Sequence, residues 1–271
     1  MKLFISADME GVSGVYKNIQ TSPNEKDWES ARKLMTDEVN AAVEGALEAG
    51  ATDVVICDSH ASGENLIPES LHPRAVLVRG TTKTLGMMEG LDSSFDAVFL
   101  LGFHAKAGTK DATLPHTYSS RTVYQVRING VEFGETALNS ALAGYFGVPV
   151  VLVSGDQSLC AEARKVIAGV TTFQTKIALS GTSILSAVPQ VVRGGMRKAA
   201  KKAVERRKNV KPLRVKMPVK VEIGFITPQM ADIACIVPWF ERRSARKIRY
   251  ICDDIKGAYS AFRAAINLAS L

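Results

Sequence analysis

Three carboxylates and two imidazoles directly follow apolar segments of the sequence, a placement from which a metal site can be built. The five side chains are those of Asp8, Glu10, His60, His104 and Glu135. In an open α/β sheet, ligands bind outside the carboxyl ends of the strands, so side chains that follow several strands meet in one crevice. Carboxylate and imidazole together suit zinc, with manganese and cobalt as alternatives. The pattern therefore predicts a metal site at one edge of a sheet.

Five protein ligands exceed the three or four that a single zinc ion usually takes. Two zinc ions per subunit that share the Asp8 carboxylate as a bridge would account for the excess. Paired ions about 3.5–4 Å apart hold a bridging water, lower its pKa and polarise a scissile carbonyl. The ligand set thus predicts a hydrolase that attacks its substrate with a metal-bridged hydroxide.

The other two histidines of the sequence lie in different surroundings. His72 precedes Pro73, and we interpret it as a structural residue. His116 lies in a long loop, 106–120, that is rich in Gly, Thr and Ser. A histidine on such a loop is either an ordinary surface residue or a general acid/base that the loop brings to the site, a role that its near-neutral pKa permits.

The elements that must position these residues alternate between strands and helices in the first half of the chain. Strands are expected at 2–7, 53–57, 75–78 and 97–101. A helix is predicted from Ser22 as N-cap to about residue 49, because Pro23 suits the first helical position and Glu25 completes a capping box. Short helices are expected in the other gaps. Repeated βα units of this kind indicate a mainly parallel sheet covered on both faces.

After residue 121 the pattern changes. Asn129-Gly130 is a strong hairpin signal and joins the strand-like segments 122–128 and 131–133. Further along the chain we expect a helix at 136–146, strands at 150–153, 214–226 and 247–252, and a final helix at 254–268. These elements fit an α/β domain over 1–271. A second, smaller lobe would begin within 155–185, which divides the chain into a metal-binding core of 1–170 and a C-terminal part of 171–271.

The charge distribution and the cysteines limit the partners and the compartment. Twelve of the 34 Lys and Arg residues lie between Arg193 and Lys220, in the pattern of an amphipathic helix with a solvated basic face. No aromatic residue is interleaved there for base stacking, so no nucleic-acid partner is expected. No apolar run reaches the roughly 20 residues that cross a bilayer, so no membrane partner is expected. The four cysteines are widely spaced, which favours reduced thiols and a cytoplasmic location.

Several short motifs occur in an order and at spacings typical of one family. They are Asp8-Met9-Glu10-Gly11-Val12-Ser13-Gly14, Asp58-Ser59-His60, Met88-Glu89-Gly90-Leu91, Leu101-Gly102-Phe103-His104-Ala105 and Gly134-Glu135. Over nearly the whole chain, the sequence resembles the dinuclear zinc D-aminopeptidase family first associated with bacterial dipeptide-transport operons. The resemblance implies the same five residues as zinc ligands and His116 as the catalytic histidine. It also implies a three-layer α/β/α fold and a homo-oligomer, a decamer of stacked pentamers that encloses the active sites.

These observations predict a zinc metallo-aminopeptidase that hydrolyses the N-terminal residue of short peptides, with D-residue-containing peptides as one option. Two alternatives stay open. A dinuclear metal phosphoesterase or amidohydrolase would use the same pair of metals. A non-catalytic peptide-binding protein of a transport system would use zinc only structurally, but structural zinc sites are normally closed four-ligand sets rich in cysteine. The carboxylate-rich ligand set counts against the second alternative.

Overall fold

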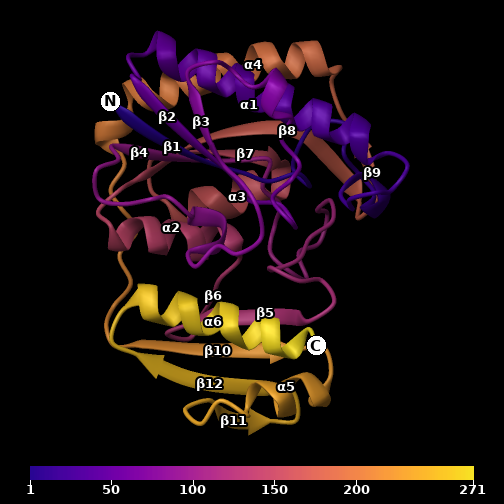
Figure 1. Ribbon diagram of the computed structural model, residues 1–271, viewed down its shortest axis with the longest axis vertical. Coiled ribbons are helices and arrows are strands. Elements are labelled where there is room, and N and C mark those ends of the chain that lie inside the picture. The colour runs from indigo at the N-terminus through magenta and orange to yellow at the C-terminus, as the bar shows by residue number, and fades with distance from the viewer.

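The computed structural model describes all residues, 1–271, and contains two β-sheets, one above the other along the long axis of the molecule (Figure 1). The first sheet has the strand order β3-β2-β1-β4-β7-β8-β9, and β9 alone runs antiparallel to its neighbour. Its strands are β1 (Lys2–Ala7), β2 (Asp53–Asp58), β3 (Ala75–Val78), β4 (Ala97–Leu101), β7 (Val150–Asp156), β8 (Thr171–Ser180) and β9 (Ser183–Leu185). The central strands β4 and β7 are buried along their whole length, as parallel strands covered on both faces must be.

Helices cover both faces of this sheet. Helices α1 (Trp28–Glu48) and α4 (Pro189–Glu205) lie side by side on one face, and α2 (Glu135–Tyr145) and α3 (Gln157–Val166) lie on the other (Figure 1). This arrangement confirms the three-layer α/β/α fold. Helix α4 buries an apolar stripe that includes Met196 and Ala200, while Lys198, Lys201 and Lys202 are exposed, as the amphipathic pattern predicts. No helix is long and apolar enough to pass through a bilayer.

The order of the strands places a topological switch point between β1 and β4. From β1 the chain continues to β2 and β3 on one side of the sheet, then returns to β4 on the other side of β1. In register, Ala7 at the end of β1 pairs with Asp58 of β2 and with Leu101 of β4. The loops that carry Asp8, His60 and His104 therefore leave the sheet from three neighbouring strand ends, where open α/β sheets bind their ligands.

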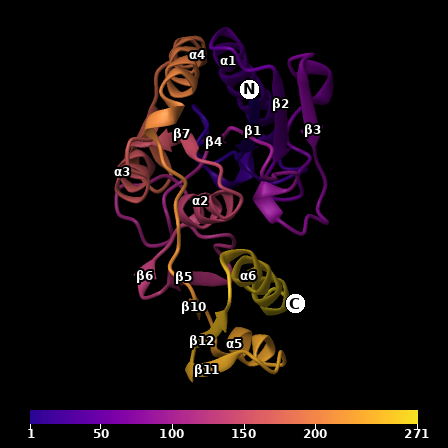
Figure 2. The ribbon, with the colours of Figure 1, turned by 90° about the vertical axis from the view of Figure 1, so that its left-hand side faces the viewer.

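The second sheet is antiparallel, with the strand order β11-β12-β10-β5-β6. Its strands are β5 (Val123–Ile128), β6 (Val131–Glu132), β10 (Val219–Phe225), β11 (Glu241–Ser244) and β12 (Lys247–Cys252). Strands β5 and β6 form the hairpin predicted at Asn129-Gly130, and the φ angles of these residues, 51° and 84°, suit a type I′ turn. Helices α5 (Pro228–Ala234) and α6 (Ile255–Ala269) pack on this sheet, and α6 lies between it and α2 (Figure 2).

The predicted start of the first long helix is wrong. Helix α1 begins at Trp28 after Asp27, and the segment before it contains only one 3-10 turn, η1 (Asn18–Gln20). The hydroxyl of Ser22 donates to the carbonyl of Asn18 instead of capping a helix. Asn24 has φ of 69°, which lies in the left-handed region and cannot belong to an α-helix. The residues that fit a capping box, Ser22 to Glu25, therefore form turns in this structure.

Two further expectations need correction. The short helices predicted between β2 and β4 are single 3-10 turns, η2 (Pro68–Ser70) and η3 (Gly86–Met88). The strand expected from residue 214 begins only at Val219, because Pro218 has no N–H to donate to a sheet. The structure also contains elements that were not predicted, namely α3, β8, β9, α5 and β11.

The two sheets interleave along the chain. Strands β5 and β6, at 123–132, belong to the second sheet, whereas β7 to β9 and helix α4, at 150–205, return to the first sheet and its outer layer. The expected division into 1–170 and 171–271 does not coincide with the boundary between the sheets. A single hydrophobic core includes residues from both, such as Phe99 of β4 and Ile223 of β10.

Candidate metal centre

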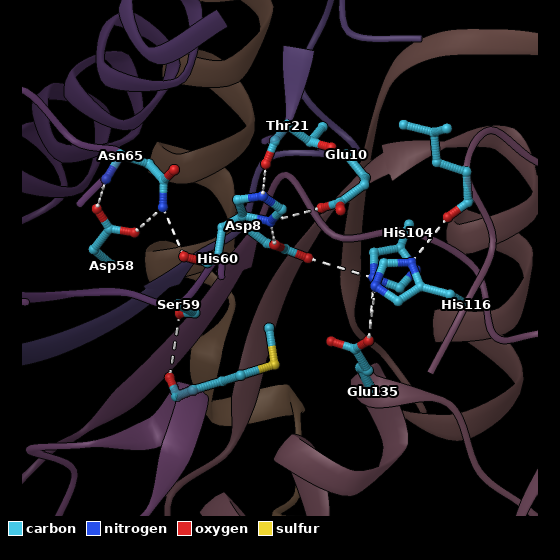
Figure 3. Close-up of polar contacts among 12 residues, drawn as sticks. Asp8, Glu10, Thr21, Asp58, Ser59, His60, Asn65, His104, His116 and Glu135 are labelled. Atoms are coloured by element: carbon cyan, nitrogen blue, oxygen red, sulfur yellow. Dashed lines mark hydrogen bonds and ion pairs between the residues drawn. The ribbon is translucent and has the colours of Figure 1, made fainter. Parts of the chain in front are cut away.

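The five predicted ligands converge on one buried cluster (Figure 3). Asp8 and Glu10 follow β1, while His60 and His104 follow β2 and β4, the neighbours of β1 in the sheet. Glu135 is the first residue of α2, where the helix dipole favours a negative charge. None of the five residues is more than 8% exposed. The structure thus brings together every residue that the strand-end pattern selected.

The Asp8 carboxylate lies between the two imidazoles and offers one oxygen to each. Its Oδ1 is 3.1 Å from His60 Nδ1, and its Oδ2 is 3.6 Å from His104 Nε2. Glu10 Oε2 lies 3.0 Å from His60 Nδ1 on one side, and Glu135 Oε1 lies 3.2 Å from His104 Nε2 on the other. The cluster therefore has two halves, with Asp8 in contact with the histidine of each.

Backbone carbonyls fix the orientation of both imidazoles. His60 Nε2 lies 2.6 Å from the carbonyl oxygen of Thr21, and His104 Nδ1 lies 3.0 Å from that of Ala105. A carbonyl only accepts hydrogen bonds, so these ring nitrogens carry the N–H. In the neutral rings, His60 Nδ1 and His104 Nε2 then present lone pairs to carboxylate oxygens. A contact between a lone pair and a carboxylate oxygen is repulsive unless a cation lies between them. Histidines that bind a metal usually donate their other ring N–H to a carbonyl or a carboxylate, as these two do.

Unpaired buried atoms at the same place also fit a cation. Asp8 Oδ2, Glu10 Oε2 and His104 Nε2 are fully buried and make no hydrogen bond. Buried polar atoms are nearly always paired, so three such atoms in one cluster require an explanation. Asp8, Glu10 and His104 each offer one ligand atom, and these three atoms lie within 4.8 Å of one another. This mixed carboxylate and imidazole set fits zinc and related divalent metals.

The pKa shifts of the cluster reflect its uncompensated negative charge. Burial and the neighbouring Glu10 raise the pKa of Asp8 to about 7. Burial lowers the pKa of His104, but Glu135 and Asp8 outweigh it and raise that pKa to about 10. Both shifts favour a bound proton. A divalent cation would supply the same positive charge in place of these protons.

His116 also lies at the cluster, on the loop between β4 and β5. Its ring stacks on that of His104, with 3.8 Å between the ring centroids and 11° between the planes. Its Nδ1 lies 3.0 Å from the carbonyl oxygen of Leu114, and its Nε2 lies 3.7 Å from Glu135 Oε1. Burial and His104 lower the pKa of His116. His116 therefore lies at the cluster and not on the open surface of its loop.

The loop that carries His116 is anchored on both sides of the cluster. The N–H of Tyr118 donates to Glu135 Oε1 over 2.6 Å, and the Tyr118 hydroxyl contacts that of Tyr259 on α6. The Tyr118 ring packs edge-on against Phe262 of the same helix, 5.0 Å between centroids. Helix α6, which packs on the second sheet, therefore takes part in holding His116 beside the candidate metal ligands.

Glycines allow the ligand loops to pack backbone against backbone. The N–H of Gly11 donates to the carbonyl of Gly102 over 2.7 Å, and a Cβ on Gly11 would lie 1.9 Å from the carbonyl oxygen of Phe103. Gly102 has φ of 68°, and a Cβ there would lie 2.2 Å from the carbonyl oxygen of Asp8. The glycines of these two motifs are thus needed to bring the loops of Asp8 and His104 together.

Two residues that sequence reasoning missed hold the loop of His60. Asp58 Oδ2 accepts the N–H groups of Asn65 and Leu66 at 2.6 and 2.7 Å. The Asn65 side-chain amide donates to Asp58 Oδ1 and to the carbonyl of His60, at 2.9 and 2.7 Å. Figure 3 shows this bridge beside the cluster. Asp58 is the last residue of β2. Like the candidate ligands it lies at a strand end, and this position was the signal that could have identified it.

Lys176, on β8, holds the loop of Glu10 in a similar way. Its buried ammonium donates to the carbonyl of Glu10, and to those of Val12 and Val15 at 2.9 and 2.5 Å. Burial lowers its pKa to about 8. No local pattern could have identified this residue, because it lies more than 160 positions from the loop that it supports.

A cleft of about 490 Å³ opens beside the cluster. Asp8, His60, His116 and Glu135 line it together with side chains of α6. Its volume lies within the range of about 300–1,000 Å³ found for small-molecule sites. A small substrate can therefore reach the cluster from a space between the two sheets. His72 does not line this cleft.

Comparisons with known proteins agree with this geometry. A sequence model of the peptidase family described as D-aminopeptidase matches residues 1–264. A D-aminopeptidase of Bacillus subtilis (strain 168) is 33% identical over 273 residues, which cover 99% of this chain and 98% of that protein. The solved structure of the zinc-dependent D-aminopeptidase DppA from Bacillus subtilis, a self-compartmentalizing protease, has a TM-score of 0.97 and 32% identity, covering 100% of this chain and 98% of that one. The chain therefore belongs to the D-aminopeptidase family and is a metal-dependent aminopeptidase.

Proposed function

We propose that this aminopeptidase uses two zinc ions per subunit to release the N-terminal residue of short peptides. Glu10 and His60 would hold one ion, His104 and Glu135 the other, and Asp8 both. The observation that carries the proposal is the placement of the two Asp8 oxygens, each facing the lone-pair nitrogen of a different histidine. When bound, such a metal pair would polarise the scissile carbonyl and make a water acidic enough to attack it.

His116 is the residue that we assign to proton transfer. Its Nδ1 hydrogen bond to the carbonyl of Leu114 leaves Nε2 as the accepting nitrogen. Because His116 lines the cleft beside Glu135, this nitrogen lies where it can take a proton from the attacking water and give it to the leaving amine. The residue could also serve as a metal ligand, since its Nε2, His104 and Glu135 form a second group with ligand geometry. The His116→Ala variant separates these two roles, because only the loss of a ligand should lower the metal content.

We also propose that the protein forms a homo-oligomer in the cytoplasm, a decamer of stacked pentamers. An apolar surface supports the association of subunits, since four large hydrophobic residues at the edge of the first sheet and the start of α4 are 61–64% exposed: Leu179, Leu185, Val188 and Val191. Exposed apolar residues that lie near one another often mark interfaces. All four cysteines are free, which fits a reducing compartment. The solved relative is described as self-compartmentalizing. Analytical ultracentrifugation of the purified protein tests the oligomer size.

The substrate is tested with a panel of L- and D-aminoacyl amides and dipeptides, each assayed with zinc and after treatment with a chelator. We expect zinc-dependent release of the N-terminal residue, with D-residues preferred, as the family description implies. A phosphomonoester assayed beside the peptides should not be hydrolysed. Hydrolysis that persists without metal, or activity on the phosphomonoester alone, would contradict the proposal.

A further inference from the structure

The lining of the cleft beside the metal cluster also carries positive charge. Lys83, Arg121 and Arg263 line it, and Asp8 and Glu135 of the metal cluster are its only carboxylates. None of the three cations forms an ion pair. Cations that line a cleft without an acidic partner remain free to bind an anionic group of a ligand.

Neutral backbone groups orient two of these cations. The ammonium of Lys83 donates to the carbonyl of Asp58, and Arg263 Nη1 donates to the carbonyl of Lys83 over 3.3 Å. Gly86 has φ of 56°, and a Cβ there would lie 2.0 Å from Arg263 Nη1, so the glycine makes room for the guanidinium. Contacts of this kind position the two side chains but leave their charges uncompensated.

The two cations come from different parts of the fold. Lys83 lies on the connection between β3 and β4, whereas Arg263 lies on α6. They also line a second depression of about 520 Å³, which shares Ala61, Thr81 and Asn267 with the metal cleft and contains no acidic residue. Lys83 and Arg263 therefore line both spaces, whereas none of the candidate metal ligands lines the outer depression.

We propose that Lys83 and Arg263 form a subsite for the C-terminal carboxylate of the substrate, so that the enzyme selects short peptides with a free C-terminus. A peptide with its scissile bond at the metal cluster would direct its far end toward these cations. The planar guanidinium of Arg263 matches a carboxylate with two parallel hydrogen bonds, and the Lys83 ammonium adds a second charge. This inference rests on the proposed peptidase function and adds the chemistry by which substrates are chosen.

The test compares the zinc-loaded enzyme on one dipeptide and on the C-terminal amide of the same dipeptide. We expect kcat/KM to be about 10- to 100-fold higher for the free acid, mainly through a lower KM, because hydrogen bonds between charged groups contribute that much to binding. Arg263→Gln should reduce this preference to near one, and Lys83→Met should reduce it in part. Lys256→Gln is the matched control, since this exposed cation lies on the same helix but does not line the cleft.

Equal kcat/KM of the native enzyme for the acid and the amide would overturn the subsite. The subsite would also be overturned if Arg263→Gln kept its melting temperature but lost the same factor in kcat/KM on both substrates. Such a loss would reflect a disturbed active site. Failure of the native enzyme to hydrolyse either substrate with zinc present would instead contradict the proposed function. Arg263→Lys provides a further check, because it keeps the charge but loses the fork and should retain an intermediate preference.

Discussion

His104 and His116 stack ring on ring with 3.8 Å between their centroids, yet only His104 is fixed directly at the end of a strand. His104 faces two carboxylates, Asp8 and Glu135, and is almost fully buried. The side chain of His116 is 19% exposed and lines the cleft. The stacked pair thus joins a residue suited to hold a metal with a residue that a substrate can touch.

Replacing His116 tests this division of roles. We expect His116→Ala to keep its metals and to lose about 10²- to 10⁴-fold in kcat, the usual contribution of a general acid/base. Metal analysis and steady-state kinetics on the same preparation provide the measurement. A loss of one metal equivalent would make His116 a ligand, and turnover close to that of the native enzyme would remove it from the mechanism. His72→Ala is the matched control, because His72 lies outside the cleft.

The shared position of Asp8 predicts an unequal effect of two neighbouring carboxylates. The native protein should bind close to two equivalents of zinc. Asp8→Ala should lower the metal content more than Glu10→Ala, because Asp8 forms ion-pair contacts with both histidines, whereas Glu10 forms one with His60 alone. Elemental analysis after metal loading and desalting measures the difference. Identical metal content in the two variants would argue against a bridging carboxylate.

Zinc binding should release protons, and the pKa values of Asp8 and His104 should set the pH range over which the zinc affinity changes. In the metal-free protein the pKa of Asp8 is about 7 and that of His104 is about 10, so both groups hold protons below these values. Metal ligands must be deprotonated, so the apparent zinc affinity should rise as the pH rises through about 7 and should keep rising toward about 10. Calorimetric titrations at one pH in buffers of different ionisation enthalpy count the protons. Binding enthalpies that are independent of the buffer would contradict this expectation.

The raised pKa of His104 should make the metal-free protein less stable as the pH rises, whereas the zinc affinity should increase. The pKa of His104 rises in the fold from its ordinary value of 6.5 to about 10. The stabilisation that protonated His104 gains from Glu135 is therefore complete below pH 6.5 and is lost as the pH rises through about 10. Urea unfolding of the metal-free protein across this range should show a decreasing free energy of unfolding. The zinc-loaded protein should not show this decrease from His104, because its imidazole is already deprotonated.

The close packing of the ligand loops predicts a steric effect of one methyl group. Gly11→Ala places a Cβ 1.9 Å from the carbonyl oxygen of Phe103, which requires the backbone to move. Overpacking of this kind costs about 1–3 kcal/mol in the free energy of unfolding, and the displaced loop should also weaken zinc binding. Gly181→Ala is the control, because no atom lies within 4 Å of its Cβ position. Equal stability of the two variants in urea would show that the loop of Gly11 relaxes without cost.

The meeting of the five carboxylate and imidazole side chains could be predicted from the sequence because it follows from a local rule. Ligands after parallel strands share one edge of the sheet, and the register of Ala7 with Asp58 and Leu101 brings them together. The role of Lys176 and the cationic wall of the cleft depend instead on contacts between distant segments, such as Arg263 with Lys83. The misplaced start of α1 has a third cause, because the same residues that form a capping box also form turns.

The interleaving of the two sheets determines how this protein could have been assembled and how it can be dissected. The polypeptide passes from β4 to β5, back from β6 to α2, and again from α4 to β10. Neither sheet corresponds to one uninterrupted stretch of the gene. A truncation that removes the second sheet from residue 121 onward also deletes Glu135, and excision of the hairpin alone cuts the connection between His116 and that glutamate. The candidate metal centre and the second sheet are thus inherited as a unit.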